Sequence, residues 1–178
     1  GSATRNVATN CKAVTAANLR RFMMCTDDRH AADIKGKGHL DNALRIAVKA
    51  GMNPVWAVTA ATLNTAECYR LYGKGAIAPG YDADIAVFDD LTDFQCSYTF
   101  KNGKLVAKDG EALFDAGEKF LPDAVKNTVH IGQVSADSFK LGLKGKKANV
   151  IRLISNNVVT ERVVREVESK DGDVVLKG

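Results

Sequence analysis

The sequence predicts an α/β part followed by β structure. Residues 1–72 carry apolar side chains mostly at helical spacing, with one short continuous apolar run among them. From Gly75 onward, short strand-like runs alternate with Asn-Gly and Asp-Gly turns. The chain has 178 residues, enough for one domain or two small ones with a real hydrophobic core.

Helical segments account for most of the first part. Residues 10–21 show a helical pattern, and residues 41–50 show another that ends before Gly51, a favourable residue just after a helix. Asn53-Pro54 predicts a further helix start, because Asn caps helices and Pro suits their first turn. The helical pattern continues or restarts over residues 62–72 and is expected to end at one of the following glycines.

The short apolar run at residues 21–26 predicts a buried parallel strand. It is short for a helix and stops abruptly at acidic residues, as buried strands do when polar side chains follow them. A core helix has a similar composition, so periodicity alone leaves that alternative open.

The second part predicts strands and tight turns. Residues 83–88 have a strand pattern, and Asn102-Gly103 between two apolar runs predicts a hairpin with a type I′ turn. Asp109-Gly110 predicts another turn. Further strands are expected at residues 128–131, 148–154, 158–167 and 174–176.

Composition argues against several classes of partner. The net charge is +4, and the only tight basic group, at residues 144–147, is more typical of a solvated turn than of a nucleic-acid site. No apolar run reaches membrane-spanning length, and no secretion signal opens the chain. We therefore expect no nucleic-acid or membrane partner.

Free thiols in a reducing cytoplasm are expected for the four cysteines, which lack Cys-x-x-Cys spacing: Cys11, Cys25, Cys68 and Cys96.

The first motif that could carry chemistry is Cys-Thr-Asp-Asp-Arg-His at residues 25–30, directly after the predicted strand. A carboxylate beyond a barrel strand sits where barrel enzymes place catalytic groups. There it can bind a metal and exchange a proton with metal-bound water. Neighbouring aspartates on an extended chain face opposite ways, so we expect one inward and one outward. The alternative is a polar loop in which Asp27 or Asp28 caps the next helix.

The second motif spans residues 74–89. Pro79-Gly80 predicts a type II turn, because Pro fixes φ at its first central position and Gly allows positive φ at its second. By chemistry alone this motif is structural. Asp82 and Asp84 are expected to bond to nearby backbone donors rather than to a metal.

Together these motifs resemble the amidohydrolase superfamily. Gly-x-Ile-x-Pro-Gly-x-Asp-Ala-Asp-Ile-x-Val, at residues 75–87, is similar to the segment by which amidohydrolases return from their barrel to a small β domain. Thr-Asp-Asp-Arg-His and the later Gly-His-Leu-Asp at residues 38–41 resemble the adenine deaminase family in particular. So do Gly-Ser-Ala-Thr-Arg-Asn at residues 1–6 and the stretch over residues 129–160.

The resemblance implies three parts. Residues 1–73 would be the closing segment of a TIM-like barrel with its final strand. Residues 74–120 would belong to the small β-sandwich-type domain, and residues 121–178 would begin a further β-rich domain. The chain opens without Met and lacks most of a barrel, so we expect a fragment. Gly1-Ser2 could be native or a remnant of recombinant expression, and both origins stay open.

The resemblance also implies an activity. The family hydrolyses adenine to hypoxanthine and ammonia, in purine salvage, at a divalent-metal centre of manganese, iron or zinc. Asp27 matches the catalytic aspartate that binds metal and moves a proton. Ser2, Asp28 and Arg29 are candidate contacts to adenine. His39 is expected to be a structural hydrogen bonder near a helix start.

The remaining metal ligands of the family are missing. Its other ligands include a His-x-His motif, which this chain lacks, and its histidines are limited to His30, His39 and His130. One aspartate does not complete a catalytic metal site, so the chain alone is expected to bind no metal and to be inactive.

Two alternatives and one expectation about assembly complete the interpretation. The chain could be a fragment of another amidohydrolase that acts on cyclic amides, or a non-catalytic β-rich binding or scaffold module. A truncated barrel would expose apolar side chains, and such patches favour association into a homo-oligomer. The side chains expected to be exposed are Phe22, Met23, Val55 and Trp56.

Overall fold

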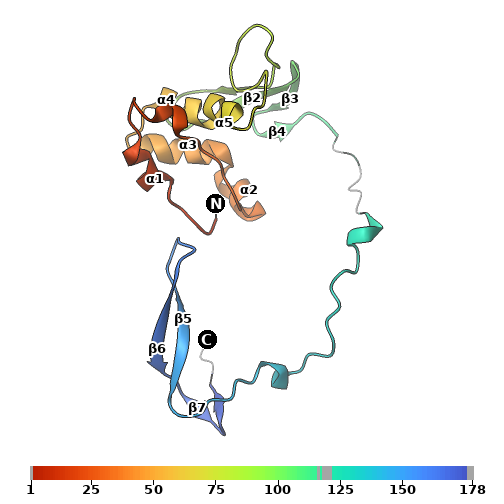
Figure 1. Ribbon diagram of the computed structural model, residues 1–178. Helices are drawn as coiled ribbons and strands as arrows, with labels where there is room; N and C mark the ends of the chain where they lie inside the picture. Colours follow the sequence, from red (N-terminus) through yellow and green to blue (C-terminus); the bar gives the residue numbers. More distant parts are fainter. Residues whose placement is uncertain (1, 116, 118–121, 176–178) are drawn as a thin grey trace. The chain divides into compact units, whose positions relative to one another are not determined.

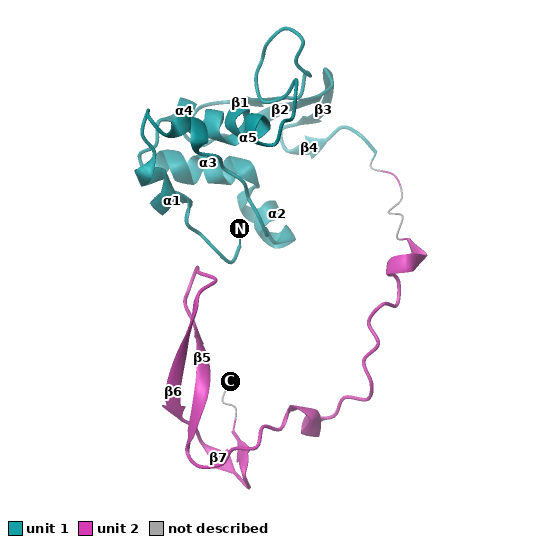
Figure 2. Cartoon of the chain, in the orientation of Figure 1, with its two compact units in different colours: residues 1–115 teal, residues 116–178 magenta. Residues whose placement is uncertain are grey.

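The computed structural model describes residues 2–115, 117 and 122–175, and the chain divides into two compact units (Figure 2). Unit 1 comprises residues 1–115 and unit 2 comprises residues 116–178. One boundary was predicted near residue 73, and the structure has helices before this point and strands after it. Both sides of the point belong to unit 1. The second predicted boundary, near residues 120–123, falls partly outside the described residues.

Helices form the first part of unit 1 (Figure 1). They are α1 (Val7–Asn10), α2 (Ala31–Lys37), α3 (Leu40–Lys49), α4 (Pro54–Ala61) and α5 (Leu63–Cys68), with 3-10 turns η1 (Cys11–Ala13) and η2 (Leu19–Arg21). The helices predicted at residues 41–50 and after Asn53-Pro54 are confirmed as α3 and α4. Asn53 caps α4, because its Oδ1 accepts the N–H groups of Val55 and Trp56 at 2.9 and 3.3 Å. α5 ends at Cys68, earlier than predicted.

The continuous helix predicted at residues 10–21 is wrong. The chain becomes extended at Val14, with φ −83° and ψ 129°. Asn18 then closes a tight turn, since its side chain donates to the Ala13 carbonyl at 2.9 Å and accepts from the Thr15 N–H at 2.7 Å. Such side-chain bonds offer the backbone an alternative to helical hydrogen bonding.

The strand predicted at residues 21–26 is also wrong. This segment follows η2 without regular secondary structure, because no strand in the described part of the chain pairs with it. The Met24 N–H instead donates to the Ala60 carbonyl at 3.1 Å, and Met24 is buried. The buried Asn64 amide from α5 donates to the Leu19 and Phe22 carbonyls, each at 2.8 Å. The segment is therefore an extended strap held against helices.

The core of unit 1 joins the helices to the strand region. Ala47 in α3 and Ala57 and Ala60 in α4 have no exposed surface, and such small side chains let the neighbouring helices approach closely (Figure 1). Phe94, from the loop after the first strand, is equally buried and packs with this helical cluster. Its ring meets Phe88 edge-to-face at a centroid distance of 5.5 Å.

Two of the four side chains predicted to be exposed are instead partly buried. Phe22 and Trp56 pack against the core, because the strap and α4 turn these rings toward the helices. Met23 and Val55 are exposed as predicted, at 39% and 60%. The four cysteines are free thiols, as predicted, and burial raises the pKa of the Cys11 thiol.

One antiparallel sheet follows the helices. Its strands pair in chain order: β1 (Ile85–Phe88), β2 (Cys96–Lys101), β3 (Lys104–Lys108) and β4 (Glu111–Ala112). The predicted strand and both predicted turns are confirmed. Asn102 and Gly103 have φ of 50° and 74°, the positive values that a type I′ hairpin turn requires.

Unit 2 consists of a loop-rich stretch and two hairpins. Its elements are η3 (Asp123–Val125), η4 (Ala136–Phe139), β5 (Lys147–Leu153), β6 (Thr160–Glu166), β7 (Ser169–Lys170) and β8 (Asp173–Val174). β5 and β6 confirm two predicted strands, and they pair with each other in antiparallel fashion over seven residues. No described residue of unit 2 is fully buried, so the apolar core shown here belongs to unit 1.

Two further strand predictions in unit 2 have different outcomes. The strand at residues 128–131 is wrong, because nothing described pairs with this segment and Val129 and Ile131 are 77% and 75% exposed. The strand at residues 174–176 begins in β8, and residue 176 lies outside the described residues. Within the described residues, no helix has the length and apolar character needed to cross a membrane.

Candidate functional site

Asp27 and Asp28 lie in the loop between the strap and α2. Both side chains are exposed, so the predicted inward and outward pair does not form, because the chain is not a strand here. Asp27 has φ 52°, in the left-handed region that Asp tolerates better than most residues. Neither carboxylate bonds to a residue that the structure describes. The alternative, in which Asp27 or Asp28 caps the next helix, is wrong as well. α2 begins after His30, and neither aspartate side chain caps it.

Ser2 secures the start of α2 from a distant part of the chain. Its backbone N–H donates to the Asp28 carbonyl at 2.8 Å. Its Oγ accepts the His30 N–H at 2.9 Å and donates to Asp33 Oδ2 at 2.6 Å. Ser2 thereby satisfies a helix-terminal N–H that no neighbouring residue reaches.

Arg29 belongs to the same cluster. Its Nε donates to the Gly38 carbonyl at 2.9 Å, which ties the loop to the end of α2. Its Nη2 is shielded from solvent and has no hydrogen-bond partner among the described residues. The structure therefore gathers Ser2, Asp28 and Arg29 around the start of α2, with Asp27 exposed beside them.

His39 hydrogen bonds at the start of α3, as expected. Its Nε2 lies 2.9 Å from Thr26 Oγ1, next to Asp27. Its backbone N–H donates to Asp41 Oδ1 at 2.6 Å, and Asp41 pairs with Arg45 at 2.5 Å. These bonds connect the Asp27 loop to α3.

A complete metal site is not formed by these residues. Within residues 2–115, 117 and 122–175, no three side chains of His, Cys, Asp or Glu come close enough together to hold one ion. A catalytic zinc ion is held by three protein ligands and a structural one by four. Asp27 can offer one carboxylate, and the described residues do not fit a whole centre.

The second motif forms an ion-pair network that fastens the 73–84 loop to the sheet. Pro79-Gly80 makes a turn, in which the Tyr81 N–H donates to the Ala78 carbonyl at 3.1 Å and Gly80 has φ 83°. Asp84 accepts the Asn102 N–H at 2.9 Å, as predicted for a backbone donor, and it also binds Lys101. Lys74 bridges Asp82 and Asp84 at 2.8 Å each, so Asp82 binds a side chain rather than the backbone.

This network predicts an acid-sensitive fold. Hydrogen bonds from Lys101, Lys74 and the Asn102 N–H hold the pKa of Asp84 well below its ordinary value near 4. A carboxylate with a depressed folded-state pKa stabilises the fold above its unfolded pKa, and this contribution disappears as the pH falls toward the folded value. We expect the urea midpoint of unit 1 to fall between about pH 5 and pH 3, and to fall less in Asp84→Asn.

A matched control separates Asp84 from general acidification. Asp109→Asn leaves an Asn-Gly turn, which suits the same positive φ, and Asp109 lies outside the lysine network. It should keep the full pH dependence of the parent chain. If the urea midpoint of Asp84→Asn falls with pH as steeply as that of the unsubstituted chain, Asp84 is not the source of the acid sensitivity.

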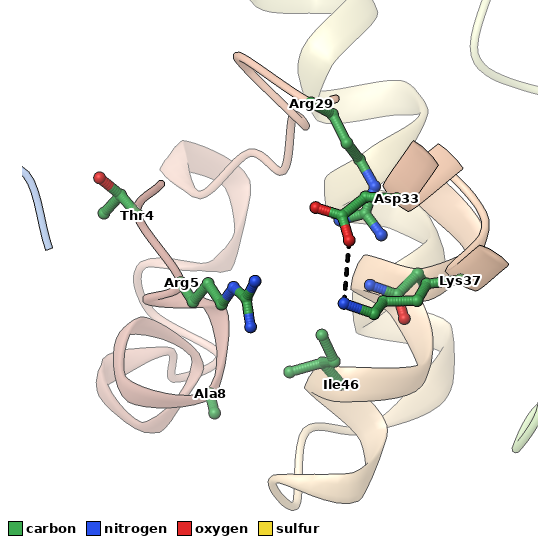
Figure 3. A pocket seen from close by; sticks show the side chains of 8 residues that line it. Thr4, Arg5, Ala8, Arg29, Asp33, Lys37 and Ile46 are labelled. Atoms are coloured by element: carbon green, nitrogen blue, oxygen red, sulfur yellow. Dashed lines mark hydrogen bonds and ion pairs between the residues drawn. The ribbon is translucent and has the colours of Figure 1, made fainter. Parts of the chain in front are cut away.

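Sequence reasoning missed Arg5, Asp33 and Lys37, which meet Arg29 in a pocket (Figure 3). The spacing of Asp33 and Lys37 could have signalled their ion pair at 2.9 Å, since residues four apart face each other on a helix. No local signal indicates that Arg5 approaches them from another segment.

Comparison with known proteins gives one family and a consistent set of relatives. The family model for the amidohydrolase family matches residues 2–106. An adenine deaminase of Nitratidesulfovibrio vulgaris is 45% identical over 167 residues, 94% of this chain and 29% of that protein. Adenine deaminases of Clostridium acetobutylicum and Lysinibacillus sphaericus are 41% and 38% identical, each over 97% of this chain and 30% of their own length. The chain thus spans about 30% of the length of these relatives.

Proposed function

This chain belongs to the amidohydrolase family, and from that premise we propose that it is part of an adenine deaminase, which converts adenine and water to hypoxanthine and ammonia. The observation that carries the proposal is the similarity to adenine deaminases along nearly the whole chain. Loss of an amino group from a ring carbon is a hydrolysis of a C–N bond, in keeping with a family of hydrolases.

The family implies a divalent metal in the whole enzyme. We propose that Asp27 supplies one ligand to it and that manganese, iron or zinc occupies the centre. The exposed Asp27 carboxylate, which bonds to no described residue, supports this role. The other ligands would come from parts of the enzyme outside this chain, because the chain has three histidines and no His-x-His.

The residues around the start of α2 are the candidates for adenine binding. Ser2, Asp28 and Arg29 lie in one cluster beside Asp27, and they offer hydroxyl, carboxylate and guanidinium groups. Purine nitrogens include hydrogen-bond donors and acceptors, so such a mixed set suits them. We propose these contacts for the whole enzyme.

The proposed place of each part follows the family match. Residues 1–73 would close the barrel, residues 74–120 would contribute to a β-sandwich-type domain, and residues 121–178 would begin a further β-rich domain. The family match over residues 2–106 runs through the first of these parts and into the second. We also propose a cytoplasmic, homo-oligomeric enzyme of purine salvage. The exposed Met23 and Val55 support the oligomer, because burying them on association is favourable.

The experiment that tests the function uses the full-length enzyme supplied with manganese. Ammonia release is measured with adenine and with a related aminopurine, and ring opening of a cyclic amide, which releases no ammonia, is followed by chromatography of the product. We expect rapid release from adenine, slower release from the aminopurine, and no ring opening of the cyclic amide. Cleavage of the cyclic amide with adenine left intact would favour the other kind of amidohydrolase and overturn the proposal.

A further inference from the structure

A pocket of about 260 Å³ lies between the N-terminal segment, α2 and α3 of unit 1 (Figure 3). Arg5 and Lys37 reach toward each other from opposite walls, and Arg29 reaches in beside Asp33. Asn42 and Ile46 from α3 complete the lining. The pocket is therefore built from separate segments, and three of its side chains are cationic.

The charges in the pocket do not balance. Asp33 is its only lining carboxylate, and both of its oxygens are already used: Oδ1 accepts from Lys37 at 2.9 Å and Oδ2 accepts from Ser2 at 2.6 Å. Arg5 donates only to the backbone of Ser2, at 3.3 Å, among the residues described. Neither Arg5 nor Arg29 has a carboxylate within ion-pair distance in that part of the chain. The Arg29 charge helps to lower the pKa of Asp33, so this one carboxylate faces three cationic side chains.

One of these guanidinium groups also has a hydrogen bond left unmade. Arg29 Nε donates to the Gly38 carbonyl, while its Nη2 is shielded from solvent and lacks an acceptor among the described residues. A buried donor without an acceptor is unfavourable, and more so when it is charged. The Asn42 side-chain amide bonds to no described residue either, and it adds a neutral donor to the same lining.

We propose that this pocket binds a small oxyanion of the phosphate or carboxylate class. An oxyanion would place negative charge among Arg5, Arg29 and Lys37, which share the single lining carboxylate of Asp33. The planar guanidinium fork matches the paired oxygens of such groups, and hydrogen bonds of this kind are stronger than neutral ones. Arg29 is also a candidate adenine contact in the proposed function. The two roles are tested separately, because the titration measures anion binding and the deaminase assay measures ammonia release.

Isothermal titration of the 178-residue chain tests the site with inorganic phosphate and, in a second arm, with acetate. Chloride keeps the ionic strength constant, because screening alone changes the binding of charges. We expect one saturable phosphate site whose affinity falls at least about tenfold in Arg29→Gln. Arg5→Gln should weaken it similarly, and since Arg5 is exposed, this variant tests the site without removing a buried contact.

Arg20→Gln is the matched control. Arg20 is exposed, pairs with Glu67 and lies outside the pocket, so its removal subtracts the same charge elsewhere. It should leave the affinity unchanged within about twofold, a free-energy change well below that of a lost charged hydrogen bond. Saturable binding of acetate but not phosphate would support the site and identify a carboxylate as its ligand. Absence of saturable binding by both anions, or equal loss in Arg20→Gln, would overturn the proposal.

Discussion

Asp27→Asn in the full-length enzyme is expected to lower kcat for adenine by a factor of roughly 10² to 10⁴, the range typical of losing a general acid or base. Asparagine has nearly the same shape as aspartate, but it carries no charge and cannot take up and return a proton. Since Asp27 bonds to no described residue, the substitution should leave the fold intact. The measurement is steady-state ammonia release together with the thermal midpoint of each variant.

Asp28→Asn is the matched control for this variant. Asp28 is the neighbouring exposed aspartate in the same loop, and its side chain likewise has no described partner. We expect a smaller loss of kcat, consistent with a positioning role near the substrate. Full activity in Asp27→Asn, or a loss in Asp28→Asn greater than in Asp27→Asn, would contradict the assignment of Asp27.

Phe94→Ala is expected to lower the free energy of unfolding by about 3 to 5 kcal/mol, as removal of a fully buried aromatic ring does. Phe94 has no exposed surface and packs with the helical cluster, while its edge-to-face partner Phe88 ends β1. The substitution therefore opens a cavity where the sheet region meets the helices. Urea unfolding followed by far-ultraviolet circular dichroism and by Trp56 fluorescence measures the effect.

The control for this prediction is Phe139→Ala in unit 2. Phe139 is 71% exposed, so its removal should change the free energy of unfolding by less than about 0.5 kcal/mol. Circular dichroism and Trp56 fluorescence should also report a single unfolding transition for unit 1, because the Phe94 ring joins its helices to its sheet region. An effect of Phe94→Ala as small as that of Phe139→Ala would show that the sheet and the helices do not share a core.

Features with a short-range cause could be predicted from the sequence. Asn53-Pro54 specifies a helix start and Asn102-Gly103 specifies a hairpin turn, because each depends on the conformations of adjacent residues alone. Asp109-Gly110 behaves in the same way. The predicted positions of this helix start and of these two turns agree with the structure to within two residues.

Features that depend on a distant partner could not be predicted. The apolar run at residues 21–26 has strand composition, but a strand needs a neighbour, and in the described chain the run packs on α4 and α5 instead. Residues 128–131 lack a pairing segment in the same way. The local bonds of Asn18 ended the helix predicted at residues 10–21.

The candidate site also combines features that the sequence could predict with features that depend on contacts between distant segments. Asp27, Asp28 and Arg29 are consecutive, so the sequence could group them, and the match to a known family motif added Ser2. The bonds by which Ser2 reaches His30 and Asp33 join separate segments, and only the fold shows them. The charge imbalance around Arg5 and Arg29 likewise becomes visible only when α2 and α3 are placed beside the first segment.

Ammonia release from adenine by the 178-residue chain alone, with added manganese or iron, tests the central claim most directly. The account predicts no turnover and no uptake of metal by the chain, while the full-length enzyme deaminates adenine under the same conditions. Genuine turnover by the chain would mean that Asp27, His30 and His39 build a working site by themselves, which would contradict the claim that this chain holds one ligand of a larger centre.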